Sequence, residues 1–491
     1  MIAKNNPDIE VTIVDLSAER IKAWQSDDLP IHEPNLLDVV QSARDSTPSR
    51  PANLFFSTEV KACIAKADLI FVSVNTPTKN TGAGKGRASE LSYVESAIRM
   101  IAEVSTSDKI IVEKSTVPVR TAEAMREVLL ANCKPGVKFE ILSNPEFLAE
   151  GTAIKNLVYP DRILIGSLNS EAGLSAAASL VDVYTAWVPR EKIITTNLWS
   201  SELAKLAANC LLAQRISSIN ALSAICENTG ADVAEVAFAC GLDSRIGPKM
   251  LGASVGFGGS CLKKDILSLA YIAESVGLKE VSDYWRAIND MNEYQKTRFA
   301  KRIVDRLYGS LIGKRIAILG FAFKKDTGDC RESAAISIVA DLVAEGATIT
   351  IYDPKAPAAS IWWELENVGL DRKLNEKKII LVDSAEEAVV GASAAVIVTE
   401  WDEFSNKDLH VAPEVQVNGS KIEFTTTNGS KKGVTADGRL DWAHLATLMA
   451  RPMYVFDGRN IVDVGKLQNL GFRVECIGKV GTGKKIVVDY D

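Results

Sequence analysis

Cysteine and histidine are scarce in this sequence, and their scarcity excludes several classes of protein. Only eight cysteines and three histidines occur among the 491 residues. No two cysteines form a Cys-x-x-Cys pair, so the pattern is neither a disulfide framework nor a zinc finger. The histidines are too few to favour a histidine-based metal site or triad, and we expect no metal. Sparse cysteine favours a reducing compartment, so the expected location is cytoplasmic.

Long apolar runs and an excess of basic residues are also missing. No apolar run reaches the roughly 18 residues of a membrane-spanning helix, so no membrane partner is expected. Lys4-Asn5-Asn6-Pro7-Asp8 interrupts any apolar core near the start, unlike a signal peptide. The net charge of −7 argues against nucleic acid as a partner. The length and the ordinary hydrophobic content of 47% predict a globular protein of two or three domains.

What the sequence does contain is an alternation of apolar runs and helical patterns. Two helical patterns, at 91–103 and 120–131, separate runs in the first part, and a helix from about Ser333 does so in the last part. Fully apolar strands that alternate with helices predict doubly wound parallel sheets. The runs that predict these strands are 10–15, 68–74, 109–113 and 139–143, and then 315–321, 348–353 and 394–399.

A long stretch of purely helical pattern separates the two series. Residues 198–227 have apolar residues at helical spacing and contain no proline or glycine, which predicts one long helix. The predicted fold class is therefore α/β, with two Rossmann-like parallel-sheet domains joined by a long central helix. Turn residues predict loops at 45–51 and 407–439, the second with a small hairpin near 422–425 or disorder as alternatives. The predicted domains are 1–196, 197–305 and 306–491.

Glycine is missing where a dinucleotide-binding domain would need it. Such a domain opens with a strand, a Gly-x-Gly-x-x-Gly turn and a helix, and an acid about 20 residues further on binds the adenosine ribose. Asp15 has the position of that acid, but no glycine precedes it. Without the internal first strand, two neighbouring strands would each lose a hydrogen-bonding partner. Two interpretations stay open: an incomplete gene model or alternative start, and a natural variant impaired in cofactor binding.

The most specific chemical signal is the glycine-rich run from Gly256 to Cys261. A helical pattern at 266–274 follows it, so Cys261 is expected at or near a helix N-terminus, where the helix dipole favours a thiolate. The glycines let a substrate approach the backbone closely. Asp265 lies one helical turn after the cysteine. Together these features indicate a nucleophilic cysteine rather than a small buried one.

With its neighbours, this run resembles the catalytic-cysteine motif of the UDP-glucose 6-dehydrogenases. The resemblance extends over nearly the whole chain, and its motifs occur in the same order. They are Asn75-Thr76-Pro77-Thr78, residues 113–118 (EKSTVP), 144–151 (NPEFLAEG), 202–209 (ELAKLAAN), 256–265 (GFGGSCLKKD), 320–327 (GFAFKKDT) and 456–459 (FDGR).

The resemblance implies a four-electron oxidation of UDP-glucose to UDP-glucuronate with two NAD reduced. The sugar C6 alcohol becomes an aldehyde and then a carboxylate. A cysteine explains the second stage, because it adds to the aldehyde, the thiohemiacetal loses hydride to give a thioester, and water releases the acid. An acid at Asp15 would repel a 2′-phosphate, so NAD is expected rather than NADP.

The resemblance also assigns catalytic roles. Cys261 is the nucleophile, and Lys205 with Asn209 stabilises or protonates the C6 oxygen, with Asp265 as the partner of Lys205. Glu146 positions and deprotonates the hydrolytic water, which Thr116 helps to order. The residues alone leave plainer alternatives open: a solvated helix face for Lys205, a helix cap for Thr116, and first-turn helix acids for Glu146 and Glu150.

Binding residues follow from the same resemblance. The NAD contacts that it implies are Asp15, Arg20, Val74, Asn75, Thr76, Pro77, Thr78, Ser115, Thr116, Val117, Glu150 and Arg331. The substrate contacts are Glu146, Phe147, Leu148, Lys205, Asn209, Arg245, Gly252, Phe257, Gly258, Phe323, Lys324 and Arg459. Arg331 and Arg459 have surface charge as an alternative, and Arg245 resembles a residue that reaches the substrate of a neighbouring subunit.

Three points remain open at this level. Gly252 stands where relatives often have lysine, so one phosphate contact is in doubt. A dehydrogenase for another nucleotide sugar such as GDP-mannose is the nearest alternative, and a non-catalytic UDP-sugar-binding subunit impaired in NAD binding is the alternative from another class. A homo-oligomer, either a dimer or an assembly of dimers, is expected, with the long helix in the dimer core.

Overall fold

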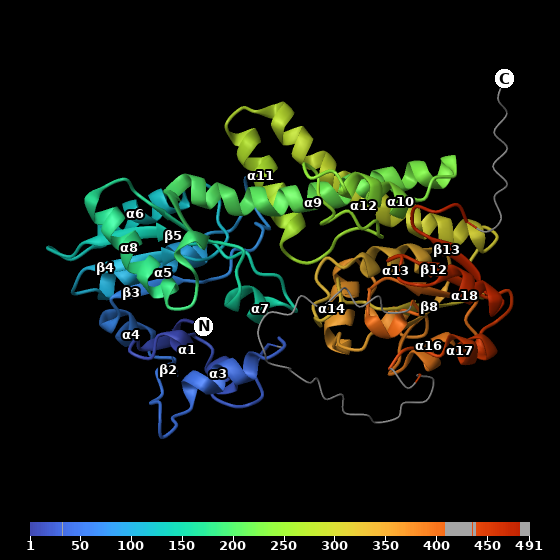
Figure 1. Ribbon diagram of the computed structural model, residues 1–491, viewed down its shortest axis with the longest axis horizontal. Helices are drawn as coiled ribbons and strands as arrows, with labels where there is room; N and C mark the ends of the chain where they lie inside the picture. The colour runs from blue at the N-terminus through green and yellow to red at the C-terminus, as the bar shows by residue number, and fades with distance from the viewer. Residues whose placement is uncertain (32, 408–434, 436–437, 482–491) are drawn as a thin grey trace. The chain divides into compact units, whose positions relative to one another are not determined.

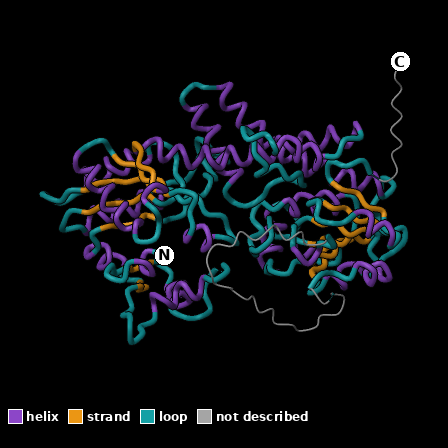
Figure 2. Tube along the Cα trace, in the orientation of Figure 1, coloured by secondary structure: helices purple, strands orange, loops and turns teal. Residues whose placement is uncertain are grey.

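The computed structural model describes residues 1–31, 33–407, 435 and 438–481. The chain divides into two compact units, Met1–Leu211 with Cys261–Ala287, and Leu212–Ser260 with Ile288–Asp491. Each unit contains strands and helices in alternation, as Figures 1 and 2 show. Within the described part of the chain, every helix is too short or too polar to cross a lipid bilayer.

In the first unit, β4 and β5 occupy the residues that the sequence predicts for strands, and β1 and β3 are shorter than predicted. Strands β2, β6 and β7 were not among the predicted ones. In chain order the elements up to the long helix are α1 (Ile2–Asn5), β1 (Val11–Val14), α2 (Ala18–Trp24), α3 (Leu36–Arg44), β2 (Leu54–Ser57), α4 (Val60–Lys66), β3 (Leu69–Val72), α5 (Ser92–Val104), β4 (Lys109–Glu113), α6 (Thr121–Asn132), β5 (Phe139–Ser143), α7 (Ala153–Val158), β6 (Ile163–Ser167), α8 (Glu171–Thr185), a 3₁₀ turn (Arg190–Lys192) and β7 (Ile193–Asn197).

The strands of the first unit fall into two sheets. One is the parallel pair β1–β2, and the other has the order β3-β4-β5-β6-β7. Its pairs are parallel except for β5 and β6, where Ser143 faces Gly166 in an antiparallel bridge. Among the described strands, β1 and β3 thus each pair on one side only.

Alternate residues of the larger sheet pack against different helices. Ile111 and Ile141 belong to a core cluster with side chains of α5 and α6. Val112 and Leu142 belong to another cluster with α8, including Leu180. Because successive side chains of a strand point to opposite faces, α5 and α6 cover one face of the sheet and α8 covers the other.

The long helix confirms the sequence prediction and extends it by two residues. α9 covers Leu198–Thr229 and stands out as the long green helix in Figure 1. Three more helices follow it: α10 (Val233–Gly241), α11 (Leu262–Ser275) and α12 (Lys279–Arg306). Helices α9 and α12 contribute residues to both units. Neither helix contains proline or glycine, the two residues that interrupt or destabilise a long helix.

The second unit contains a six-stranded parallel sheet with the order β10-β9-β8-β11-β12-β13. Its elements after α12 are β8 (Arg315–Leu319), α13 (Ala334–Ala344), β9 (Thr348–Tyr352), α14 (Ala358–Asn367), α15 (Arg372–Asn375), β10 (Ile379–Leu381), α16 (Ala385–Val389), β11 (Ala394–Ile397), a 3₁₀ turn (Asp402–Phe404), α17 (Trp442–Leu448), β12 (Tyr454–Asp457), α18 (Val464–Asn469) and β13 (Arg473–Cys476).

Both faces of this sheet are covered, which confirms the doubly wound architecture. Ile316 and Ile318 of β8 pack in one cluster with α13 and α14, whereas Ala317 and Leu319 pack in another with α16 and α17. A parallel sheet buried on both faces requires such fully apolar strands. The turn at 45–51 is confirmed by the close Thr47–Arg50 bridge. The possible hairpin at 422–425 lies outside the described residues.

Candidate functional site

Cys261 lies at the start of a helix, as its sequence context predicts. It is the N-cap residue of α11, a helix of 14 residues, and it is exposed to solvent. The backbone N–H of Asp265 donates to the carbonyl of Cys261 at 2.9 Å and closes the first turn. At a helix N-terminus the backbone N–H groups and the dipole favour a negatively charged sulfur.

Three more predicted catalytic residues form a buried polar cluster in the same unit. Lys205 and Asn209 lie one turn apart on α9, and Asp265 lies in the first turn of α11. Lys205 and Asn209 are each 9% exposed and Asp265 is 1% exposed. The amide of Asn209 donates to Asp265 Oδ2 at 2.6 Å. The alternative of a solvated helix face for Lys205 is therefore wrong.

The charge state of Lys205 depends on these neighbours. Burial lowers the pKa of the Lys205 ammonium, and the negative groups of Asp265, Cys261 and Glu146 act against that effect. These interactions bring three of the predicted catalytic residues close to a fourth, Lys205. Asp265 forms its hydrogen bond with Asn209 rather than with Lys205, so its influence on Lys205 is electrostatic. Among the described residues no group of His, Cys, Asp and Glu has the arrangement of a metal site.

Glu146 lies in the irregular segment between β5 and α7. Because α7 begins only at Ala153, neither Glu146 nor Glu150 is a first-turn helix acid. Lys114 Nζ lies 3.0 Å from Glu146 Oε2 and donates to Asn144 Oδ1 at 3.2 Å. The phenol of Tyr184 donates to the same Asn144 oxygen at 2.6 Å.

Lys114 and Asn144 were missed as candidates by sequence reasoning. Each is the first residue after a strand, β4 for Lys114 and β5 for Asn144. These strands are hydrogen-bonded neighbours in parallel orientation. Polar residues that follow adjacent parallel strands meet at one edge of the sheet, so their positions in the sequence contained a usable signal.

Two predicted cofactor segments meet just after β3 and β4, which are neighbouring strands. The hydroxyl of Ser115 donates to the Val74 carbonyl at 2.6 Å, and the hydroxyl of Thr76 donates to the Thr116 carbonyl at 2.8 Å. The segments 74–78 and 115–117 therefore lie side by side after β3 and β4. Thr116 is not a helix cap, because the N-cap of α6 is Arg120, with a left-handed φ of 77°.

A buried pair of carboxyl groups supports this region, and it was also missed. The carboxylate of Glu202 accepts from the backbone N–H of Arg120 at 2.7 Å and from that of Ala122 at 2.8 Å. Glu113, which is 2% exposed, hydrogen-bonds to Glu202. Burial and then the charge of Glu202 raise the pKa of Glu113 well above its usual value, and burial also raises the pKa of Glu202. A hydrogen bond between two carboxyl groups requires a proton on one of them.

This pair makes a prediction for stability against pH. A folded-state pKa raised above the unfolded value means that the folded protein binds the extra proton, so stability is lost as pH rises through the raised pKa. Glu113→Gln keeps a neutral hydrogen-bond donor and removes this loss. We expect the unfolding free energy of the variant, relative to the parent, to increase with pH by at most about 1.4 kcal/mol per pH unit.

Thermal melts at about pH 5 and pH 8 measure this difference. Glu123→Gln is the matched control, because Arg120 holds the pKa of that carboxyl below its usual value, so the group is ionised in both states over this pH range and its replacement should give a nearly constant difference. A constant difference between the Glu113→Gln variant and its parent across this pH range would contradict a shared proton.

Asp15 and Arg20 are brought together as the adenosine side of the predicted cofactor site. The backbone N–H of Ser17 donates to Asp15 Oδ1 at 2.8 Å, and the Arg20 guanidinium donates to Asp15 Oδ2 at 2.8 Å. The Ser17 N–H and then Arg20 hold the pKa of Asp15 below its usual range. Asp15 is therefore an ionised acceptor at the end of β1.

Most of the predicted substrate residues of the second unit also gather in one place. A β-carbon on Gly258 would lie 3.0 Å from the Phe323 Cβ, and one on Gly259 would lie 2.9 Å from the Phe323 ring. The Gly259 N–H donates to the Arg331 carbonyl at 3.0 Å. Lys324 Nζ lies 5.6 Å from the centre of the Phe323 ring. Only glycine fits at these positions, because the Glu332 carbonyl at 2.7 Å leaves no room for a β-carbon on Gly258 and the Phe323 ring leaves none on Gly259.

Arg459 is held inside this group rather than at the surface. Its guanidinium donates to the carbonyls of Val398 and Phe323, at 2.5 and 3.0 Å, and lies 3.2 Å from Glu400 Oε2. Its side chain is 11% exposed, so the surface-charge alternative is wrong for Arg459. Arg331, by contrast, has a side chain that is 54% exposed and that pairs with Asp329.

Within the described part of the chain, Arg245 and Gly252 make no hydrogen bond to this group. The Arg245 side chain is 87% exposed and pairs with Asp243. Gly252 is exposed, and a β-carbon there would meet nothing within 4 Å. The position therefore has room for a longer side chain. The segment from Ala253 to Phe257, in contrast, is buried.

Comparisons with known proteins agree with this geometry. Residues 1–188 match the NAD binding domain of the UDP-glucose/GDP-mannose dehydrogenase family, residues 199–294 its central domain and residues 317–422 its UDP binding domain. The chain is 50% identical over 489 residues to UDP-glucose 6-dehydrogenase 1 of Oryza sativa and 52% identical over 481 residues to UDP-glucose 6-dehydrogenase of Drosophila melanogaster. These matches cover 98% of this chain and 94% and 93% of the two relatives.

A solved structure shows the same fold. The UDP-glucose dehydrogenase from the hyperthermophilic archaeon Pyrobaculum islandicum superposes with a TM-score of 0.76 at 27% identity, and the match covers 98% of this chain and 94% of that one. The matched domains, the identity to the curated relatives and the gathered polar residues all agree with the resemblance inferred from the motifs. The chain belongs to the UDP-glucose/GDP-mannose dehydrogenase family.

Proposed function

We propose that this protein oxidises UDP-glucose to UDP-glucuronate with NAD. The observation that carries the proposal is the group in the first unit that combines an exposed thiol at a helix start with a buried lysine, amide and carboxylate. Such a group provides a nucleophile beside a donor for an oxyanion. About 50% identity to named UDP-glucose 6-dehydrogenases over nearly the whole chain supports the choice of substrate.

The chemistry at C6 consists of two oxidations and one hydrolysis. A hydride and a proton leave the C6 alcohol, which becomes an aldehyde. The Cys261 thiolate adds to the aldehyde carbon, and the resulting alkoxide loses a second hydride to become a thioester. Water cleaves the C–S bond, which gives the carboxylate, two protons and the free thiolate. In balance, one alcohol, one water and two NAD⁺ give one carboxylate, two NADH and three protons.

The residues around Cys261 would each have a separate role in the reaction. The Lys205 ammonium and the Asn209 amide would stabilise negative charge on the C6 oxygen, because charge-assisted donors in a dry site act strongly. Asp265 would fix Asn209 through their hydrogen bond and hold positive charge on Lys205. Glu146, positioned by Lys114, would take the proton of the hydrolytic water, with Thr116 ordering that water.

NAD would supply the hydride acceptor. The residues present fit its two ends: Asp15 with Arg20 is an ionised acceptor for the ribose hydroxyls, and segments 74–78 and 115–117 lie together after two adjacent strands. Glu150 and Arg331 are further proposed contacts. The described residues before Asp15 contain no glycine-rich turn for the pyrophosphate.

We place the UDP moiety on the second unit. Phe323, Lys324, Arg459, Phe257 and Gly258 would contact the uridine and phosphates, and the contacts of Gly258, Lys324 and Arg459 with Phe323 support this assignment. Arg245, exposed and paired with Asp243, would act on the substrate of a neighbouring subunit. Phe147 and Leu148 would border the sugar on the first unit.

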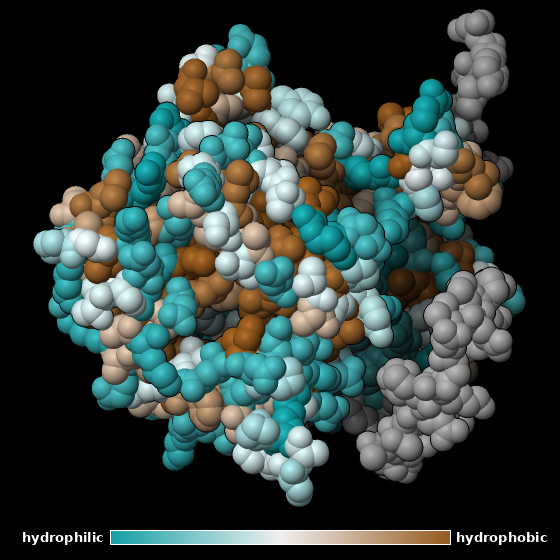
Figure 3. All heavy atoms as spheres, turned by 60° about the vertical axis from the view of Figure 1, so that its left-hand side comes forward, coloured by the Kyte–Doolittle hydropathy of each residue, from teal (hydrophilic) through white to brown (hydrophobic). Residues whose placement is uncertain are grey.

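A homo-oligomer in the cytoplasm, either a dimer or an assembly of dimers, completes the proposal. Apolar side chains of α9 remain exposed, among them Leu211 at 54% and Ile225 at 58%. The turn between α11 and α12 also exposes Val276 and Leu278, and the top of Figure 3 shows apolar surface there. Exposed apolar groups of this kind are typical of protein interfaces. The eight cysteines form no disulfide, which suits a reducing compartment.

Turnover on UDP-glucose, UDP-galactose and GDP-mannose tests the substrate. We expect two NADH for each UDP-glucose consumed, and preference for GDP-mannose would overturn the choice of sugar nucleotide. Separate calorimetric titrations with NAD and with UDP-glucose test the alternative of a non-catalytic UDP-sugar-binding subunit. Binding of UDP-glucose without binding of NAD would establish that alternative.

Gly252 allows a gain-of-affinity prediction. Relatives that it resembles often have lysine at this place, and the position is open. We expect Gly252→Lys to lower the KM for UDP-glucose by roughly 5-fold, because a lysine near the phosphates adds about 1 kcal/mol of charge-assisted binding. Gly252→Glu should raise the same KM, and the KM for NAD should stay constant in both. Steady-state kinetics measure these values, and equal effects of lysine and glutamate would contradict a phosphate contact.

A further inference from the structure

The segment from Ala253 to Phe257 is buried but has no helix or strand of its own. All five residues are less than 10% exposed. Buried backbone N–H and C=O groups need hydrogen-bond partners, and an irregular segment cannot provide them by itself. The partners in this segment come mainly from side-chain amides of other elements.

Asn292 of α12 holds one end of the segment with both halves of its amide. Its Oδ1 accepts from the Phe257 N–H at 2.8 Å, and its Nδ2 donates to the Phe257 carbonyl at 3.0 Å. Gly256 makes this approach possible, because a β-carbon there would lie 2.7 Å from Asn292 Oδ1 and its φ is 118°. Asn292 is 2% exposed, so water does not compete for these bonds.

Three other amides hold the start of the segment. Asn220 of α9 accepts from the Ser254 N–H at 2.9 Å, and Gln295 of α12 donates to the Ser254 carbonyl at 2.7 Å. Asn460, which follows β12, donates to the Ala253 carbonyl at 3.2 Å. Between them the Val255 N–H donates to the Gly458 carbonyl at 2.9 Å. Residues 253, 254, 255 and 257 thus each form a hydrogen bond with a helix or with the turn after β12.

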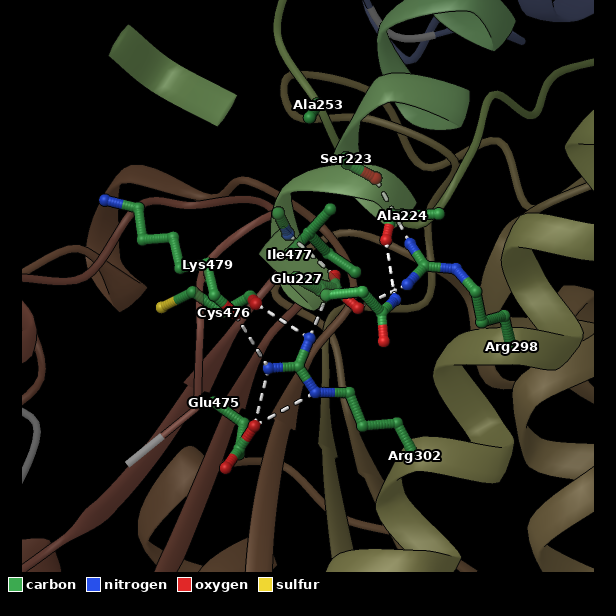
Figure 4. A network of polar contacts seen from close by, with 12 residues as sticks. Ser223, Ala224, Glu227, Ala253, Arg298, Arg302, Glu475, Cys476, Ile477 and Lys479 are labelled. Carbon is green, nitrogen blue, oxygen red and sulfur yellow. Dashed lines mark hydrogen bonds and ion pairs between the residues drawn. The ribbon is translucent and has the colours of Figure 1, made fainter. Parts of the chain in front are cut away.

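An ion-pair network fixes the orientation of one of these amides. Gln295 Oε1 accepts from the Arg298 guanidinium at 2.8 Å, which leaves Nε2 to donate toward Ser254. Arg298 also pairs with Glu227, and Arg302 joins Glu227 to Glu475 of β13, as Figure 4 shows. The contacts of Gln295 therefore allow only one of its two amide orientations.

We propose that Asn292, Gln295 and Asn220 are positioning residues that preset the 253–257 segment for the sugar nucleotide. The inference rests on the proposed function, which assigns Gly252, Phe257 and Gly258 to the substrate. Uncharged amides suit this task because they both donate and accept and do not titrate near neutral pH. A preset loop binds ligand without the entropic cost of ordering it.

Asn292→Ala tests the proposal through the split between KM and kcat. We expect the KM for UDP-glucose and the Kd for UDP in calorimetry to rise at least about 10-fold, and the KM for NAD to stay within about 2-fold. Asn289→Ala, on the same helix one turn earlier, is the matched control, because Asn289 Oδ1 has no hydrogen-bond partner among the described residues. That control should leave all these constants unchanged.

Gly256→Ala and Asn292→Asp keep the test decisive if Asn292→Ala does not fold. In Gly256→Ala the added β-carbon would clash with Asn292 Oδ1. In Asn292→Asp the carboxylate still accepts from the Phe257 N–H but has no N–H to donate to the Phe257 carbonyl. Both should weaken UDP binding in the same direction. A lower Tm with unchanged UDP affinity would show a merely structural role and overturn the inference. Failure of the parent protein to turn over UDP-glucose would instead count against the proposed function. The Kd for UDP would still show whether these residues position the 253–257 segment.

Discussion

Cys261→Ser abolishes formation of UDP-glucuronate, by at least about 10³-fold in kcat, if the thiol carries the second oxidation. Serine has nearly the same shape, but its hydroxyl is neither ionised nor a good leaving group near neutral pH. The first hydride transfer does not need the thiol. We therefore expect the variant to stall at the aldehyde or at a covalent adduct, with no more than one NADH formed for each site in a single turnover.

Mass spectrometry of the protein and quantification of NADH in a single turnover distinguish these stages. Cys240→Ser is the control, because Cys240 is also exposed but lies on α10 in the second unit. It should keep the parent rate. Undiminished uronate production by Cys261→Ser would refute the role of this sulfur, and with it the thioester route.

Lys205→Met should reduce kcat by about 10²- to 10³-fold, which is the usual cost of removing one donor from an oxyanion site. The change should be smaller in the KM for UDP-glucose, because the charge on the C6 oxygen develops mainly in the transition state. Methionine keeps the length and the apolar contacts of the buried stem. A loss confined to KM would show that Lys205 binds substrate without stabilising the reaction.

The pH dependence of the rate should reveal the same lysine. Burial lowers the pKa of Lys205, so its ammonium is lost at a lower pH than that of a surface lysine. Stabilisation of an oxyanion is present below that pKa and lost above it, which produces an alkaline decline in kcat. Lys205→Arg stays charged and should remove the decline while lowering the maximal rate. Rate profiles between about pH 6 and pH 10 measure this, and an unchanged decline in the arginine variant would assign it to another group.

The same residues show what can be predicted from sequence at the level of the site. The turn around Cys261 contains both a special composition and a following helical pattern, and local sequence determines both. The helix N-cap position of Cys261 was therefore predictable. Lys114, Asn144, Glu113 and Glu202 were not recognised as a supporting set, because their contacts join strands and helices that lie 30 to 89 positions apart in the chain.

The antiparallel pairing of β5 with β6 and the strands β2, β6 and β7 were not predicted. β7 contains Thr195, Thr196 and Asn197, and its burial is uneven, so it lacks the fully apolar run that identifies a buried strand. β2 has only four residues and sits on a two-stranded sheet. Short elements of this kind depend on their neighbours for stability, so local pattern alone is a weak guide to them.

By itself the sequence determined the α/β class, the long helix and the place of Cys261 at a helix start, because each depends on the composition and period of one contiguous segment. Tertiary structure alone decided which polar groups became partners. It buried Lys205, joined Asn209 to Asp265, brought the carboxyl groups of Glu113 and Glu202 together, and tied Phe257 to Asn292. The physical reason is that a hydrogen bond between distant residues forms only once the packed core has excluded water and fixed both groups within about 3 Å.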